Sequence, residues 1–104
     1  MGTQTAIDEK GRSVPALTPS TVQTITVAET SAAISSAVGS GTRVVRLISS
    51  TDCHYVVAAS PTAAATDSFL PANTIEYIKV KEGSSKVAAI QNAAGGTMYV
   101  TEMI

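Results

Sequence analysis

Hydrophobic and polar residues alternate in short runs along most of the chain. Between residues 22 and 28, the alternation places Ile25 and Val27 on one face of a strand and the intervening threonines on the other. Residues 42–48 place Val45 and Leu47 together in the same way. Short alternating runs bounded by Gly, Pro and Ser are typical of strands. We predict strands near residues 22–28, 42–48, 53–59, 75–80, 86–91 and 97–103.

Two segments have weaker patterns. Residues 32–38 fit either a strand or a helical turn. Residues 60–73 are rich in Ala and Thr and predict a long connection, with room for a short helical turn at 62–65. The last two strands, 86–91 and 97–103, are predicted to form a hairpin, with Gly95-Gly96 giving the turn its backbone freedom.

These elements predict an all-β fold. Short strands without a long helix between them favour antiparallel pairing, and 104 residues suffice for one domain. We expect a small antiparallel β-sandwich or jelly-roll-like barrel over residues 21–104, preceded by an extended N-terminal arm over residues 1–20.

The predicted arm has no sustained hydrophobic period. Its apolar residues Ile7, Val14 and Leu17 are isolated, too few to form a core of their own. We therefore predict that the arm lies against another subunit, with these three side chains at the interface. Phe69-Leu70 is a second candidate: the pair either caps the end of the sandwich or inserts into a partner.

The low charge bears on the kind of partner. Charged residues make up 14% of the chain, against about 25% in a typical domain. A surface with few ions to dehydrate suits a protein packed against neighbours, although an ordinary low-charge domain has the same composition. The seven basic residues are scattered, and Arg43 and Arg46 have no aromatic residue beside them, which argues against nucleic-acid binding.

The sequence offers little for catalysis. His54 is the only histidine, and its neighbour Cys53 would point to the opposite face of a strand. One His and one Cys cannot furnish a usual metal site, and Gly39-Ser40-Gly41 lacks the lysine of a phosphate-binding loop. The carboxylates on or near the late strands are interpreted as surface charges: Glu76, Glu82 and Glu102. We expect no enzymatic activity, no cofactor and a reduced, structural Cys53.

Targeting signals are also not visible. Residues 1–10 contain Asp8 and Glu9 and no apolar core of a signal peptide. No stretch approaches the ~20 apolar residues of a membrane helix. We expect synthesis and assembly in a cytoplasm, with no membrane partner.

Several short runs in the second half of the chain resemble small virion proteins of tailed bacteriophages. They span roughly residues 44–104: Ser50-Thr51-Asp52-Cys53-His54, Pro61-Thr62-Ala63, Phe69-Leu70-Pro71-Ala72, Glu76-Tyr77, Val87-Ala88-Ala89-Ile90-Gln91, Gly96-Thr97 and Val100-Thr101-Glu102-Met103.

The resemblance implies a structural subunit of the virion, present in many copies and without an active site. The leading expectation is a capsid cement or decoration protein at junctions between major capsid subunits, with a homo-oligomer as its expected form. A head–tail connector or tail protein is the structural alternative. A carbohydrate- or receptor-binding module is an alternative of another class, disfavoured by four aromatic residues and no Trp.

Overall fold

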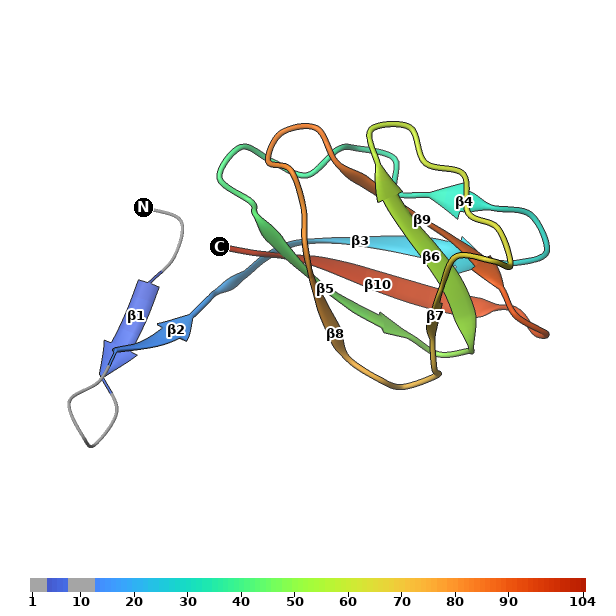
Figure 1. The fold of residues 1–104 in the computed structure, drawn as a ribbon, viewed down its shortest axis with the longest axis horizontal. Coiled ribbons are helices and arrows are strands. Elements are labelled where there is room, and N and C mark those ends of the chain that lie inside the picture. The colour runs from blue at the N-terminus through green and yellow to red at the C-terminus, as the bar shows by residue number, and fades with distance from the viewer. Residues whose placement is uncertain (1–3, 8–12) are drawn as a thin grey trace.

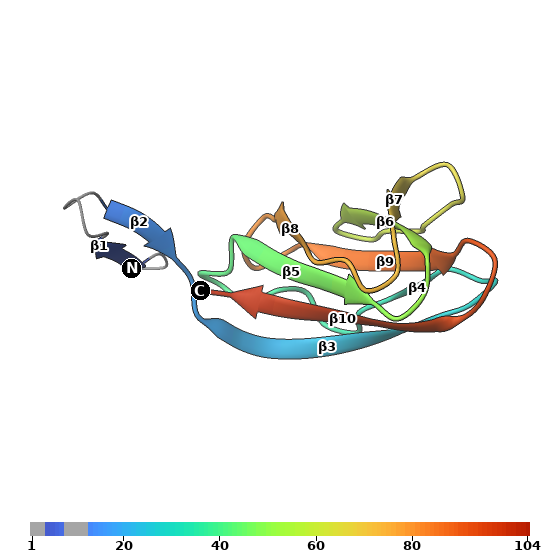
Figure 2. The same cartoon turned by 90° about the horizontal axis from the view of Figure 1, so that it is seen from below.

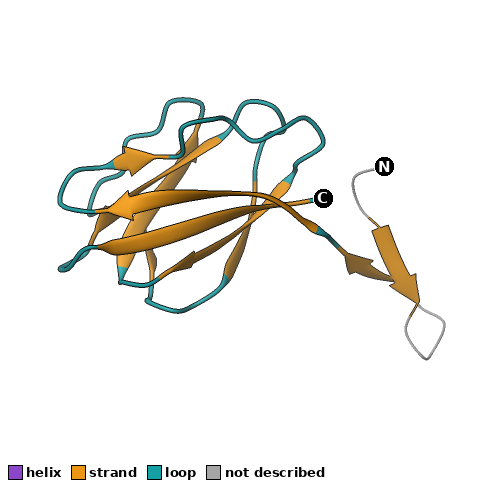
Figure 3. Ribbon diagram, turned by 180° about the vertical axis from the view of Figure 1, so that it is seen from behind, coloured by secondary structure: helices purple, strands orange, loops and turns teal. Residues whose placement is uncertain are grey.

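A computed structural model describes residues 4–7 and 13–104, and this part of the chain contains strands, turns and loops but no helix (Figure 3). The ten strands are β1 (Gln4–Ile7), β2 (Ser13–Ala16), β3 (Pro19–Val27), β4 (Ala32–Ala33), β5 (Val44–Ser49), β6 (Cys53–Ala58), β7 (Ser68–Leu70), β8 (Glu76–Lys79), β9 (Lys86–Gln91) and β10 (Gly96–Met103).

Eight of these strands form two four-stranded sheets. Sheet I has the order β3-β10-β5-β8, sheet II has the order β4-β9-β6-β7, and every neighbouring pair is antiparallel. Counted from β3 as the first, the orders are 1-8-3-6 and 2-7-4-5. This is the strand order of a jelly roll, in which two Greek keys fold over one another. The predicted all-β fold is confirmed, and Figures 1 and 2 show its strands in two views.

The core lies between the two sheets and is almost entirely aliphatic. Alternation decides which residues enter it: Ile25 and Val27 of β3 are 1% exposed, and Val45 and Leu47 of β5 are fully buried, as their period of two predicts. The other buried core residues are Ile34, Val38, Cys53, Tyr55, Leu70, Val80, Val87, Ala89, Met98 and Val100.

The six strands predicted from alternation correspond to β3, β5, β6, β8, β9 and β10, with ends that differ by at most three residues. Residues 32–38 contain only the short β4. The chain nevertheless continues beside β9, because Ile34 N–H donates to Val87 O (3.0 Å) and Val38 N–H donates to Ser85 O (2.9 Å). The predicted connection over residues 60–73 contains β7, and residues 62–65 are not helical.

The predicted hairpin of the last two strands is wrong. β9 belongs to sheet II and β10 to sheet I, so residues 92–95 cross from one layer to the other. The two glycines before and at the start of β10 serve close packing, because a Cβ on Gly95 would lie 2.9 Å from Val27 O and one on Gly96 would lie 2.6 Å from Ser50 Oγ. A Gly-Gly pair has the same local appearance in a hairpin turn and in such a crossing, so the local sequence does not distinguish them.

The N-terminal region contributes a separate two-stranded hairpin. β1 pairs antiparallel with β2 in a register from Gln4↔Ala16 to Ile7↔Ser13. It lies outside the two sheets, beyond the end of the sandwich that holds the C-terminus (Figures 1 and 3). At the start of the sandwich, Thr18 and Ile104 exchange two backbone hydrogen bonds of 2.5 and 2.8 Å, which continue the β3–β10 pairing to the chain end.

Candidate functional surfaces

Three of the residues that the sequence predicts at an interface lie in or directly after the N-terminal hairpin, outside the two four-stranded sheets. Ile7 lies in β1 and Val14 in β2, where Val14 is the register partner of Ala6. Leu17 follows the hairpin and is half-buried. The interface role of these three residues therefore stays a prediction that centres on the hairpin and the two residues joining it to β3.

Phe69-Leu70 is divided between surface and core. Leu70 is fully buried between the sheets, whereas Phe69 is 47% exposed on the outer face of sheet II. Alternation along β7 separates the two neighbours. Only Phe69 of this pair is therefore accessible to a partner in the folded domain.

Cys53 and His54 point to opposite faces of β6. Cys53 is buried in the core, where desolvation raises the pKa of its thiol above the usual value, although a hydrogen bond with Ser49 acts in the other direction. A thiol held in its protonated form is a poor nucleophile. The two side chains therefore cannot act together as a catalytic pair.

His54 instead ties loops onto the outer face of sheet II. Its Nδ1 lies 3.0 Å from Asp67 O and its Nε2 lies 3.0 Å from Asn92 Oδ1. The imidazole also contacts the ring of its cross-strand partner Phe69, with 5.4 Å between ring centroids and 56° between ring planes. With both nitrogens engaged and the side chain buried, the arrangement is a structural one.

The segment between β6 and β7 covers this outer face. Ala63 N–H donates to Ser31 Oγ (2.8 Å) beside β4, and Asp67 O contacts His54 on β6, so the segment is bonded at both sides of the sheet. Ala63 is 4% exposed and Ala88, which points outward from β9, is fully buried. We call residues 59–67 the covering segment.

Glu82 is exposed, as the sequence indicates, whereas Glu76 and Glu102 are less exposed than expected. Glu102 is 7% exposed and points into the end of the sandwich, so its interpretation as a surface charge is wrong. Alternation along β10 puts it on the same side as Met98 and Val100. Glu76 is half-buried, and its Oε1 accepts a 2.5 Å hydrogen bond from the hydroxyl of Tyr55, which joins sheet I to sheet II. Desolvation and this contact raise the pKa of Tyr55 to about 12.

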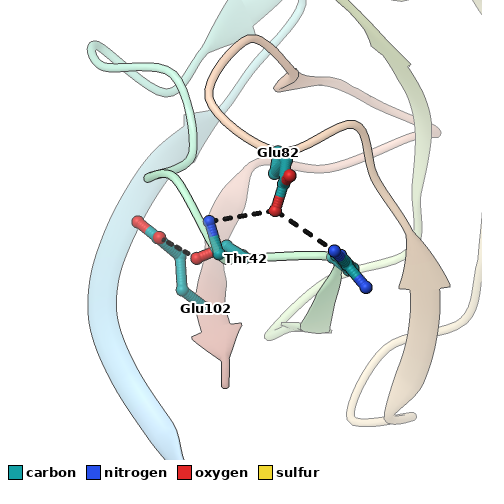
Figure 4. A network of polar contacts seen from close by, with 5 residues as sticks. Thr42, Glu82 and Glu102 are labelled. Atoms are coloured by element: carbon teal, nitrogen blue, oxygen red, sulfur yellow. Dashed lines mark hydrogen bonds and ion pairs between the residues drawn. The ribbon is translucent and has the colours of Figure 1, made fainter. Parts of the chain in front are cut away.

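Two carboxylates hold the turn before β5 from opposite sides (Figure 4). Glu102 Oε1 accepts hydrogen bonds from Gly39 N–H (2.9 Å) and Thr42 Oγ1 (2.6 Å). Glu82 Oε2 accepts one from Gly41 N–H (3.1 Å), where φ is +89°, and lies 3.5 Å from Arg43 Nε. Arg43 and Glu82 are largely exposed, so their ion pair contributes little to stability. The network provides acceptors for the backbone N–H groups of Gly39 and Gly41 and for the Thr42 hydroxyl.

Most of the large apolar side chains that are exposed in the described part of the chain lie on or beside the outer face of sheet I. Val22 on β3, Tyr99 on β10 and Tyr77 on β8 point outward and are 54%, 46% and 57% exposed. Ile75, just before β8, is 53% exposed. Half-buried Val44, Arg46 and Ile48 of the intervening β5 connect these positions. We call this surface the open face.

The open face carries hydroxyl groups and cations but lacks acidic and amide side chains. The outward positions of its four strands carry threonine hydroxyls and the cations of Arg46 and Lys79, but no carboxylate and no carboxamide. Glu76, Glu102 and Gln23 all lie at inward positions of these strands. Sequence alternation could have located these outward residues, but not the absence of a covering segment above them.

No group of three or more His, Cys, Asp or Glu side chains suited to a metal ion occurs in the described ranges 4–7 and 13–104. In the same ranges, no helix is long and apolar enough to cross a membrane. No family model, no curated protein and no solved structure matches this chain.

Proposed function

We propose that the chain is a structural virion protein without enzymatic activity, and that it acts as a capsid cement or decoration protein stabilising contacts between major capsid subunits. The open face carries this proposal. Aromatic and aliphatic residues with an arginine among them are the composition of a protein–protein contact, whereas surface residues of a free monomer are usually more charged.

Two further observations support an assembly role. The jelly-roll strand order is one that viral capsid domains use, although lectin domains and cupins use it too. A hairpin outside the sandwich gives the chain a second element that can reach a neighbouring subunit by strand pairing. The proposed partners are the major capsid protein or other virion proteins, with further copies of this chain in the same particle.

Copy number is the direct test of this proposal. Mass spectrometry of purified particles of the encoding virus measures the ratio of this chain to the major capsid protein. A cement protein is expected in numbers comparable to the capsid subunit. A head–tail connector or tail protein would be present in far fewer copies, and a chain missing from washed particles would contradict a structural role in the virion.

A carbohydrate-binding module is the second candidate, and the exposure of Tyr77 and Tyr99 on one face favours it. Sugar rings stack on exposed aromatic rings, but their hydroxyls also need hydrogen-bond acceptors such as carboxylates and amides. The outward positions of the open face lack both groups. Binding of the purified domain on a glycan array, lost in Tyr77→Ala and Tyr99→Ala, would favour this second function.

A further inference from the structure

Among the described residues, no carboxylate serves as a counter-charge for Arg46 on the open face. Arg46 lies in a cross-strand row with Thr101 and Val22 on one side and Tyr77 on the other. It is half-buried, and among the described residues the only carboxylate within ion-pair distance of an arginine is Glu82, beside Arg43. The guanidinium of Arg46 therefore has donors available for an acceptor from outside the domain.

The surroundings of Arg46 favour a protein as the source of that acceptor. Tyrosine and arginine are the residues that most often carry binding energy at protein interfaces, particularly where apolar neighbours exclude water. Here Tyr77 is the direct register partner of Arg46, and Tyr99 and Ile48 form the adjacent row. A carboxylate placed against Arg46 would be partly shielded from solvent by these side chains, and shielding strengthens a charged hydrogen bond.

A second copy of the chain is a poor occupant for this face. Face-to-face association of two copies would bring two Arg46 and two Lys79 side chains together with no carboxylate at any outward strand position. Nucleic acid is also a poor fit, because two cations among apolar side chains cannot follow a phosphate backbone.

The small size of the open face limits the strength of the contact that it can make alone. Four strands about 4.8 Å apart and about six residues long give a footprint of roughly 20 by 20 Å, or about 400 Å². A stable pairwise interface usually buries about 800 Å² on each partner. The open face alone thus gives a weak contact, and tight association needs a second contact on the same particle.

We propose that the open face docks onto a different protein, whose contact patch is apolar and presents a carboxylate to Arg46. The inference rests on the proposed function. Within that function, sheet I makes the contact, and Arg46, Tyr77 and Tyr99 contribute most of the binding energy. The covered face of sheet II and the exposed Phe69 on it lie outside this contact.

The test uses virus particles that lack this chain, with the full-length purified chain added back. Binding is measured for the wild type and for Tyr99→Ala, Tyr77→Ala and Arg46→Glu. Matched controls come from sheet II: Phe69→Ala replaces an aromatic residue of equal exposure, and Lys86→Glu reverses a half-buried cation at an outward position. Thermal unfolding of each purified variant identifies any that does not fold, and Tyr99→Thr then replaces a failed Tyr99→Ala.

We expect each open-face variant to raise the dissociation constant at least tenfold and each control to change it less than threefold. Wild-type binding should weaken as salt increases, and Arg46→Ala should reduce that dependence. Equal binding by the wild type and the open-face variants, or a loss confined to Phe69→Ala, would overturn the inference while leaving the proposed function in place. Failure of the wild type to bind would contradict the proposed function itself.

Two other outcomes would also overturn the inference. A wild-type dimer in solution that Tyr99→Ala converts to a monomer would make a second copy the occupant. Glycan binding lost in the same variants would make the face a carbohydrate site.

Discussion

The two outer faces of the sandwich differ in whether a segment of the chain covers them. On sheet II, the covering segment is bonded to Ser31 and His54 and leaves Ala88 fully buried. On sheet I, no described segment plays this part, and Val22, Tyr77 and Tyr99 are about half exposed. Two outward residues of β10 are exceptions, because Thr101, the register partner of Arg46, and Met103 are both buried.

The difference has a physical meaning. Covering a sheet costs the conformational entropy of the segment that is ordered over it, and sheet II offsets this cost with hydrogen bonds and packing. Sheet I instead presents large apolar side chains to solvent, an arrangement that marks interaction sites. A protein that acts through contact with a partner has a reason to keep one face open, whereas an isolated domain would gain stability by covering both.

The largest expected effect on the free energy of unfolding comes from a core residue of β5, and the adjacent residue on the open face is its control. Leu47 is fully buried, whereas Ile48 points outward and is half-buried. Leu47→Ala should lower the free energy of unfolding by about 2–5 kcal/mol, because it removes core packing and leaves a cavity. Ile48→Ala should cost less than about 1.5 kcal/mol, since less apolar area leaves contact. Urea denaturation measures both, and equal losses would show that the open face is covered in solution.

Removal of the imidazole should weaken the covered face. His54→Ala deprives Asp67 O and Asn92 of their partners and should cost about 1–3 kcal/mol. Amide hydrogen exchange should also accelerate in residues 59–67. Phe69→Ala is the control at the neighbouring cross-strand position, with a smaller loss and an unchanged exchange pattern in that segment. Unchanged exchange in His54→Ala would mean that the covering segment is held by other contacts.

Glu102 stabilises one end of the sandwich by accepting hydrogen bonds from Gly39 and Thr42. Glu102→Ala should cost about 1–3 kcal/mol, because Gly39 N–H and Thr42 Oγ1 lose a buried partner. Glu102→Gln keeps an acceptor oxygen in place and should lose less. Urea midpoints of the two variants give the comparison, and a larger loss for Gln than for Ala would contradict the hydrogen-bond account.

The contact between the two sheets at Tyr55 predicts a pH dependence at high pH. The folded chain holds the phenol proton up to a pKa of about 12, whereas the unfolded chain releases it near a pKa of about 10. Unfolding therefore releases a proton between these pH values, and the stability from this group is lost as pH rises from about 10 to 12. Below that window the group contributes no slope.

Tyr55→Phe isolates this effect from other groups that titrate in the same range. The stability difference between wild type and Tyr55→Phe should be constant below about pH 9 and should shift in favour of the variant as pH rises through the window. Denaturation at a series of pH values measures it. A difference independent of pH up to 12 would mean that the phenol is not desolvated against Glu76.

The smallest expected effect on stability belongs to the open face. Tyr77→Ala and Tyr99→Ala should each change the free energy of unfolding by less than about 1 kcal/mol, because half of each side chain is already in water. Thermal unfolding of the purified variants is sufficient to measure this. Losses as large as that of Leu47→Ala would place these tyrosines in a structural rather than a recognition role.

The sequence predicted what alternation determines and failed where long-range contacts decide. Ile25, Val27, Val45 and Leu47 were correctly assigned to one buried side because the period of a strand is local. The partners of the strands are not local. Gly95-Gly96 indicated a hairpin, yet β9 and β10 lie in different sheets.

The candidate surface was only partly visible in the sequence. Tyr77 and Tyr99 can be placed outward by alternation, but nothing along the chain shows that residues 59–67 cover sheet II and not sheet I. The interpretation of Glu102 as a surface charge fails, although carboxylates are usually exposed. Its burial depends on Gly39 and Thr42, which are distant in sequence.

Hydroxyl-radical footprinting of the particle-bound chain tests the difference between the two faces most directly. Oxidation of Tyr77, Tyr99 and Phe69 is quantified by mass spectrometry in the free chain and on purified particles, because the three rings have similar exposure in the free domain. We expect strong protection of both tyrosines on the particle and unchanged oxidation of Phe69. Protection of Phe69 with both tyrosines still oxidised would show that sheet II is the contact and would contradict docking through the open face.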